Sequence, residues 1–242
     1  MIPARKRPYI EAVFSRLNRR MLRRHFHALH LSGLEQVARL DRTRPIVFFG
    51  NHSCWWDGLL EFYLSREVFG LDAYLMMEER QFVRYRFFRW IGAFSVKRES
   101  PRDAVRSLRY AASLFDRPDR AVWIYPQGIM RPNDARPLSF FTGAARLAQM
   151  VNNAQLVPVA HRYEFLAEQR PDLFTAVGAP LRPETGEGPQ ALTRRIESVA
   201  TELLDGLRSC VIAGKTEAFR TVLRGRTSTN VTYDRVRAME RP

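Results

Sequence analysis

The segment Ile46-Val-Phe-Phe-Gly-Asn-His-Ser-Cys-Trp-Trp-Asp-Gly58 decides the expected fold and the expected position of the site. Its four leading apolar residues predict a buried strand that ends at Gly50. A helix is expected from about Trp55 to Phe69, because Gly70 is a typical residue to stop it. His52 therefore lies in the loop between the strand and the helix, where open α/β sheets form their sites.

His52 and Asp57 are the candidate catalytic residues. On one continuous helix they would lie about 140° apart around the axis, so they meet only if His52 precedes the helix. An aspartate on one imidazole nitrogen fixes the tautomer and leaves the other nitrogen as a general base. No serine completes a triad, since Ser53 is adjacent, and the reacting hydroxyl could belong to the substrate. The alternative is a capping histidine followed by an aspartate that the helix dipole favours.

Short apolar runs alternate with amphipathic stretches of helix length along the rest of the chain. Further strands are expected over 73–77, 94–96, 121–125, 156–160 and 173–177, and further helices over 101–115, 142–151 and 189–211. Apolar strands that alternate with helices predict an α/β fold, a mostly parallel, covered sheet with helices on both faces. In the last helix the residues expected to face inward are Leu192, Ile196, Val199, Leu203 and Leu207.

Composition narrows the classes of function. The 45% of hydrophobic residues excludes global disorder, and two cysteines among 242 residues give no disulfide framework and suggest a reducing compartment. The formal net charge of +14 implies an anionic partner: nucleic acid, an anionic membrane surface or a phosphorylated substrate. We do not expect nucleic acid, because the aromatic residues are not interleaved with the basic clusters. No segment has the roughly 18 apolar residues that a membrane span needs.

The N-terminal region, residues 1–40, is expected to contact a membrane. The first 44 residues carry 11 Lys and Arg against three acidic residues, a net charge of 11 − 3 = +8. One apolar stripe comprises Ile10, Val13, Phe14, Leu17 and Met21, and the arginines lie on an adjoining face. Such a helix can lie on the cytoplasmic face of a membrane as a peripheral anchor. The alternative is a helix packed on the following domain, residues 41–212, which precedes a C-terminal tail of unknown role, residues 213–242.

Three later segments also end in residues suited to a site. Gly92-Ala-Phe-Ser-Val-Lys-Arg98 is a short strand that ends in two cations, and Tyr125-Pro-Gln-Gly128 follows a buried strand. Gly128 permits an unusual backbone turn, and Arg131 is close enough in sequence to bind an anion there. Val157-Pro-Val159 is an apolar strand better suited to a wall than to chemistry.

In this order and spacing the segments resemble the four motifs of the lysophospholipid and glycerolipid acyltransferase family. Asn51-His52-Ser-Cys-Trp-Trp-Asp57 is similar to its N-H-x-x-x-x-D motif, and Arg98 matches the phosphate-binding arginine that ends its second block. Tyr125-Pro-Gln-Gly128 is similar to its F-P-E-G-T-R block, and Val157-Pro-Val159 to its fourth. The resemblance runs from about residue 30 to residue 207.

The resemblance implies an acyltransferase domain over residues 41–212. It would move a fatty acyl group from acyl-CoA or acyl carrier protein to the hydroxyl of a lipid acceptor, commonly 1-acylglycerol 3-phosphate. His52 would be the base, Asp57 would orient it, and Arg98 would hold the acceptor phosphate. The expected substrate-binding set is Asn51, Arg98, Gln127, Gly128 and Arg131. No cofactor is expected, and no metal, because no carboxylate or cysteine completes the histidines near residue 27.

Departures from the family pattern surround the expected acceptor site. Gln127 replaces a glutamate, Ile129-Met130 replaces Thr-Arg, and Phe141-Thr142 replaces a basic pair. They put a phosphate-bearing acceptor in question and leave two alternatives open. One is an acyltransferase with a non-phosphate lipid acceptor, and the other is a catalytically silent lipid-binding protein that docks on a membrane.

Overall fold

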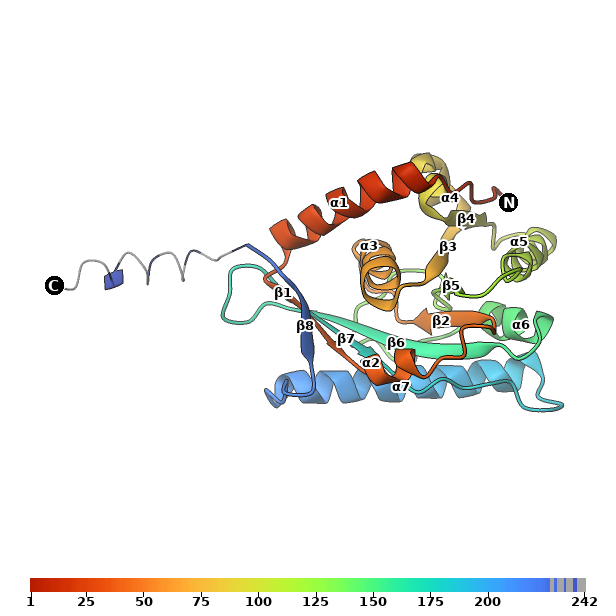
Figure 1. Cartoon of the computed structure of the whole chain (residues 1–242). Helices are drawn as coiled ribbons and strands as arrows, with labels where there is room; N and C mark the ends of the chain where they lie inside the picture. Colours follow the sequence, from red (N-terminus) through yellow and green to blue (C-terminus); the bar gives the residue numbers. More distant parts are fainter. Residues whose placement is uncertain (227–228, 230–232, 234–236, 239–242) are drawn as a thin grey trace.

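One eight-stranded sheet organises the described part of the chain, with the strand order β4-β3-β5-β2-β6-β7-β1-β8 (Figure 1). The computed structural model describes residues 1–226, 229, 233 and 237–238. The strands are β1 Ala28–Ser32, β2 Ile46–Gly50, β3 Asp72–Glu78, β4 Ala93–Val96, β5 Arg120–Ile124, β6 Gln155–Glu164, β7 Asp172–Val177 and β8 Arg220–Arg224. Only the β6–β7 and β1–β8 pairs are antiparallel among these described strands, so the predicted α/β fold with a mostly parallel sheet is confirmed.

Helices cover both faces of this sheet (Figure 1). One face carries α1 Pro8–His25, α2 Leu34–Ala38, α3 Asp57–Tyr63 and its π-helical continuation η1 Leu64–Phe69. The other face carries α5 Pro101–Ser113, α6 Gly143–Met150 and α7 Pro189–Ile212. Near the β4 edge lie α4 Glu79–Arg84 and the 3₁₀ helix η2 Arg86–Ile91.

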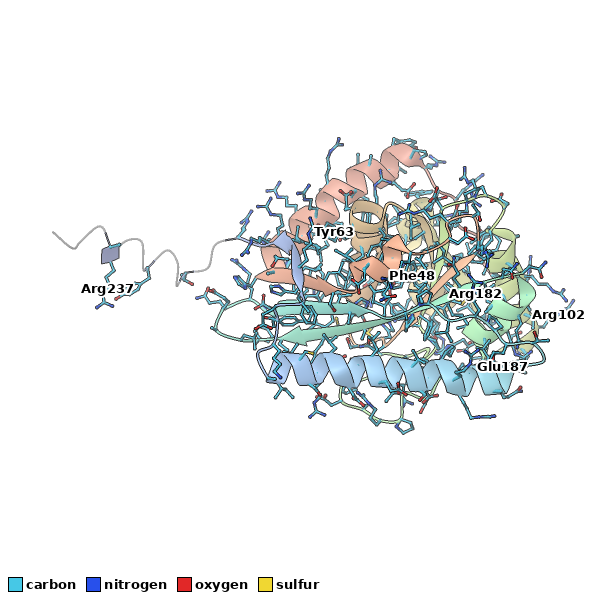
Figure 2. The ribbon with its side chains drawn as sticks, turned by 60° about the horizontal axis from the view of Figure 1, so that its bottom comes forward. Phe48, Tyr63, Arg102, Arg182, Glu187 and Arg237 are labelled. Atoms are coloured by element: carbon cyan, nitrogen blue, oxygen red, sulfur yellow. The ribbon has the colours of Figure 1, made fainter. Side chains whose placement is uncertain are left out.

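The side chains of β2 contribute to a hydrophobic core on each face of the sheet. Successive side chains of a strand point to opposite faces. Phe48 stacks on Trp123 of β5, with ring centroids 4.4 Å apart, and belongs to the core under α3. Val47 and Phe49 belong to the core under α5, α6 and α7. Figure 2 shows Phe48 inside the molecule and Arg102 at its outside.

The last helix differs slightly from its predicted inner face. In α7 the prediction is confirmed for Leu192, Ile196 and Leu207, which are buried. Between them Ala200 and Leu204 are buried in place of the predicted Val199 and Leu203, which are half-buried. With 3.6 residues per turn, steps of three and of four residues both stay on one face of a helix, and α7 takes its three-residue step only at Leu207.

The sheet continues across both predicted domain boundaries. β1, from residues 1–40, pairs with β7, and β8, from the predicted tail, pairs with β1. The rest of that tail lies largely outside the described residues.

Helix α1 packs on the domain, and this divides the apolar stripe predicted for it. Phe14 contacts the rings of Phe62, Phe87 and Phe88, so it is not free to enter a membrane. A polar side chain of α1 also faces the domain: Asn18 donates a 2.8 Å hydrogen bond to the Leu59 carbonyl.

Two side chains of the apolar stripe predicted for α1 stay at the surface. Val13 is 53% exposed and Leu17 is 54% exposed, whereas Ile10 and Met21 are half-buried. Among the described residues, no helix is both long and apolar enough to cross a membrane.

Candidate active site

The loop from β2 to α3 brings His52 and Asp57 together. β2 ends at Gly50 and α3 begins at Asp57, so the histidine precedes the helix and the aspartate occupies its first turn. The His52 Nδ1 atom lies 2.8 Å from Asp57 Oδ2. This is the geometry that the spacing required.

Asp57 is fully buried and surrounded by donors. Its Oδ2 accepts hydrogen bonds from the backbone N–H groups of Ser53, at 2.7 Å, and Cys54, at 3.0 Å. Its Oδ1 accepts a 2.6 Å hydrogen bond from the Tyr163 hydroxyl. Burial raises the pKa of Asp57, but the hydrogen bond with His52 and the other donors outweigh it and hold the pKa below its ordinary value. The carboxylate therefore stays ionised and holds Nδ1 of the imidazole.

His52 is held in place by stacking of its ring and by hydrogen bonds to its backbone. Its ring stacks on Tyr125 with centroids 4.2 Å apart. Its backbone N–H donates to Gln127 Oε1 at 2.7 Å, and its carbonyl accepts from the Arg131 N–H at 2.8 Å. The ring lines a pocket, and its Nε2 makes no hydrogen bond with a described residue. This nitrogen is available to a substrate.

The pocket is long and mainly apolar. It has a volume of about 1170 Å³ and reaches from His52 to Asp72, at the amino end of β3. The seven residues of β3 line it, and at about 3.3 Å per residue they span about 20 Å. Its apolar walls include Leu59, Phe62, Phe88, Ile91 and Leu108. At the far end Lys6 pairs with Asp72 at 2.5 Å, so the N-terminal segment forms part of the wall.

Two arginines line the pocket near the loop that follows β5. Arg98 lies so close to Gly128 that a Cβ atom there would collide with its guanidinium, and Gly128 also has a φ of +66°. The guanidinium lies over the Phe141 ring, 5.6 Å from its centroid, and the Arg98 Nε is buried without a hydrogen-bond partner. Arg146, in α6, lines the same pocket. These cations suit an anionic group beside His52.

Three predicted substrate-binding residues do not line this pocket. Asn51 is buried and holds the end of β2 to β6 through two 2.9 Å hydrogen bonds with the His161 backbone. Gln127 is buried beneath the backbone of His52. The Arg131 guanidinium turns toward Ser139 Oγ, at 3.3 Å. Of the predicted set, the structure gathers His52, Arg98 and Gly128 on the pocket, with Asp57 directly behind His52.

Other residues of the site were missed by the sequence analysis. Tyr163 lies 106 residues after Asp57, and no local pattern signals that contact. Arg146 could have been found from the sequence. It lies one helical turn after Thr142, so its positive charge is on the same side as the position where the family has a basic pair. The carboxylate thought missing near the histidines is Asp172, which lies 2.9 Å from His27 Nδ1 and 3.2 Å from His30 Nε2. Neither these three side chains nor any other group of three or more His, Cys, Asp or Glu among the described residues is arranged to hold a metal ion.

Comparison with known proteins places the chain in a family. A model of the acyltransferase family matches residues 28–162, more than half of the chain. The crystal structure of the 1-acyl-sn-glycerophosphate (LPA) acyltransferase PlsC from Thermotoga maritima is similar, with a TM-score of 0.59 and 16% sequence identity. That match covers 84% of this chain and 81% of the other, and at this identity it shows the fold alone. No curated protein matches the chain. On the family match, the chain belongs to the acyltransferase family that its four motifs predicted.

Proposed function

We propose that the protein transfers a fatty acyl group from a thioester, acyl-CoA or acyl carrier protein, to the hydroxyl of a lysophospholipid or glycerol-phosphate acceptor. The observation that carries the proposal is the His52–Asp57 pair beside a pocket about 20 Å long that is mainly apolar. A general base and an apolar channel are the two things that acyl transfer to an alcohol needs.

The proposed reaction uses His52 as base and then as acid. Nε2 takes the proton of the acceptor hydroxyl while its oxygen attacks the thioester carbonyl carbon. The tetrahedral intermediate then collapses: the carbon–sulfur bond breaks, the new ester remains, and the imidazolium returns the proton to the leaving thiolate. Asp57 stabilises the imidazolium without taking the proton, consistent with its lowered pKa.

The pocket would hold the acyl chain. Each methylene group removed from water contributes about 0.8 kcal/mol, so a long chain binds tightly to walls of leucine, isoleucine and phenylalanine. The acceptor phosphate would bind Arg98, whose Nε has no hydrogen-bond partner, with Arg146 as a second cation.

The surface of α1 is the proposed contact with an anionic membrane on its cytoplasmic side. Val13 and Leu17 are exposed on a helix that also exposes Arg16 and Arg20. This is a narrower patch than the stripe predicted from the sequence. Each arginine near an anionic surface contributes about 1 kcal/mol, and the two apolar side chains add contact that salt does not screen.

The experiment is an assay of the purified chain on a panel of lysolipids, with labelled acyl-CoA and acyl carrier protein as donors. His52→Ala should lower the turnover about 100-fold or more while the thermal melt is unchanged. Acceptors with and without a phosphate decide between the two acceptor classes. A folded His52→Ala protein with near-normal turnover would refute the mechanism, and a wild-type protein inactive on the whole panel would favour the silent lipid-binding alternative.

A further inference from the structure

The pocket holds one charged group that the proposed mechanism does not use. Glu61 lies on α3, four residues after Asp57, and lines the pocket. It is only 2% exposed, and neither carboxylate oxygen has a hydrogen-bond partner in the described structure. Four residues further along the same face, Ser65 accepts a 2.8 Å hydrogen bond from the indole of Trp123. Of these two polar residues on the pocket wall, only Glu61 is unsatisfied.

A second unsatisfied group lies beside Glu61. The hydroxyl of Tyr125 is buried and lies close enough to the Glu61 carboxyl for a weak hydrogen-bonding interaction that shifts the pKa of both groups, although no well-formed hydrogen bond joins them. The ring of Tyr125 is the one on which His52 stacks, and Tyr125 lines the pocket too. The two groups therefore meet near the base with no well-formed hydrogen bond between them, and both residues line the pocket. Leaving such groups unpaired is costly, so the geometry calls for a polar group of a ligand.

The protonation of the pair defines which ligand group fits. Burial raises the pKa of Glu61 well above its ordinary value; the interaction with the Tyr125 hydroxyl lowers it in part, and the nearby charge of Asp57 raises it. Burial likewise raises the pKa of Tyr125. A neutral carboxylic acid and a neutral phenol can each donate one hydrogen bond and accept others. An alcohol, which also donates and accepts, satisfies both, whereas a methylene group satisfies neither.

We propose that the pocket accepts a donor acyl chain that carries a hydroxyl group near its thioester, and that Glu61 and Tyr125 bind this hydroxyl. The inference rests on the proposed function and adds the class of donor. One turn of α3, about 5.4 Å, separates Glu61 from Asp57 along the helix axis. The Tyr125 ring is 4.2 Å from the ring of His52. The bound hydroxyl therefore lies within a few bonds of the reacting carbonyl, as on carbon 3 of the chain.

The first test compares two CoA thioesters of equal length, 3-hydroxytetradecanoyl and tetradecanoyl, with the same acceptor. The wild-type protein should use the hydroxylated donor with a kcat/KM about 10-fold higher or more, because the plain chain leaves the hydrogen-bonding capacity of both polar groups incompletely met. Glu61→Leu should reduce the ratio to about 1 or below by improving the use of the plain chain. Glu61→Gln, which keeps a donor and an acceptor, should keep most of the preference.

The matched control is Phe62→Leu, an apolar change on the same helix and the same pocket. It should change kcat/KM for both donors by one common factor and leave their ratio unchanged. Thermal melts establish that each variant is folded. Glu61→Leu removes an uncompensated buried carboxyl, so its melting temperature should equal or exceed that of the wild type.

A binding measurement separates this inference from the proposed function. Trp55 and Trp123 line the pocket, so their fluorescence reports on a bound chain. The full-length His52→Ala protein should bind free 3-hydroxytetradecanoic acid about 10-fold more tightly than tetradecanoic acid. This binding does not depend on whether the protein catalyses acyl transfer. Equal affinities for the two acids, or equal kcat/KM values of the wild type for the two donors, would overturn the inference. Water would then be the partner of Glu61 and Tyr125. Failure of acyl transfer with selective binding intact would overturn only the proposed function.

Discussion

Acidification is expected to destabilise the fold through His161, a histidine of β6 that is fully buried behind the site. Its Nδ1 lies 3.0 Å from the Thr175 hydroxyl, and its Nε2 has no hydrogen-bond partner. Burial lowers the pKa of His161 from 6.5 to about 4, although the charge of Asp57 acts in the opposite direction. His161 is therefore neutral in the folded protein at pH 7.

The sign and the size of this change in stability follow from proton linkage. Well above pH 6.5 His161 is neutral in both the folded and the unfolded state and contributes nothing to the pH dependence. As the pH falls from 6.5 to about 4, the unfolded chain binds a proton that the folded chain does not, so stability falls. Between pH 7 and pH 5 this amounts to about 2 kcal/mol. Below about pH 4 both states are protonated and the loss stops growing.

Two neighbouring carboxyls must be separated from this effect. The pKa of Asp57 is lowered, so its contribution is lost only below about pH 4. The pKa of Glu61 is raised, so stability is lost as the pH rises above 4.5, the opposite direction in the same window. The pH dependence of the wild-type free energy of unfolding therefore sums the contributions of His161, Asp57 and Glu61. Comparison with a His161 variant isolates the contribution of His161.

The assay is urea unfolding of the wild type and of His161→Phe at pH 7 and pH 5. His161→Phe keeps a ring in the core and loses the titrating group. On going from pH 7 to pH 5 the wild type should lose about 2 kcal/mol more than this variant. His25→Asn, at an exposed histidine, is the control and should follow the wild type. Parallel pH dependences for the wild type and His161→Phe would refute the reasoning.

Three further outcomes are expected. Tyr163→Phe, which removes a hydrogen-bond donor to Asp57, should lower kcat about 10-fold with little change in either KM, measured by steady-state kinetics. Arg98→Ala should raise the KM of a phosphate-bearing acceptor about 10-fold or more and leave the donor KM unchanged, whereas Arg102→Ala, at an exposed arginine, should change neither. Replacing Val13 and Leu17 together by glutamate should lower sedimentation with anionic liposomes at least about 10-fold without moving the thermal melt. Unchanged sedimentation of that variant would show that α1 is not the anchor.

Much of the fold was predictable because it depends on local pattern. The apolar runs around residues 46, 121, 156 and 173 form strands, and Ser100 caps α5 by accepting a hydrogen bond from the Asp103 N–H. β8 and the packing of α1 were not predictable in this way. Both depend on contacts between distant residues, such as Leu29 with Leu223 and Asn18 with Leu59, and periodicity carries no information about them.

The same distinction between local pattern and contacts of distant residues applies to the candidate site. The spacing of His52 and Asp57 required a loop followed by a helix, and the structure has that arrangement. Glu61 was not recognised, although the helical period places it one turn after Asp57 on the same face. What the sequence lacked was the position of Tyr125, which directly follows β5 and lies with its phenol beside Glu61.

The departures from the family pattern have a physical account in these contacts. The side chain of Gln127 accepts a hydrogen bond from the His52 N–H, a role that needs an oxygen and not a charge. An amide at that buried position avoids the cost of burying an unpaired carboxylate. Arg146 lines the pocket on the side where the basic pair is lost. The replacements thus leave the orientation of His52 intact and move positive charge by one helical turn. A phosphate acceptor therefore remains compatible with this site, and the acceptor panel tests it.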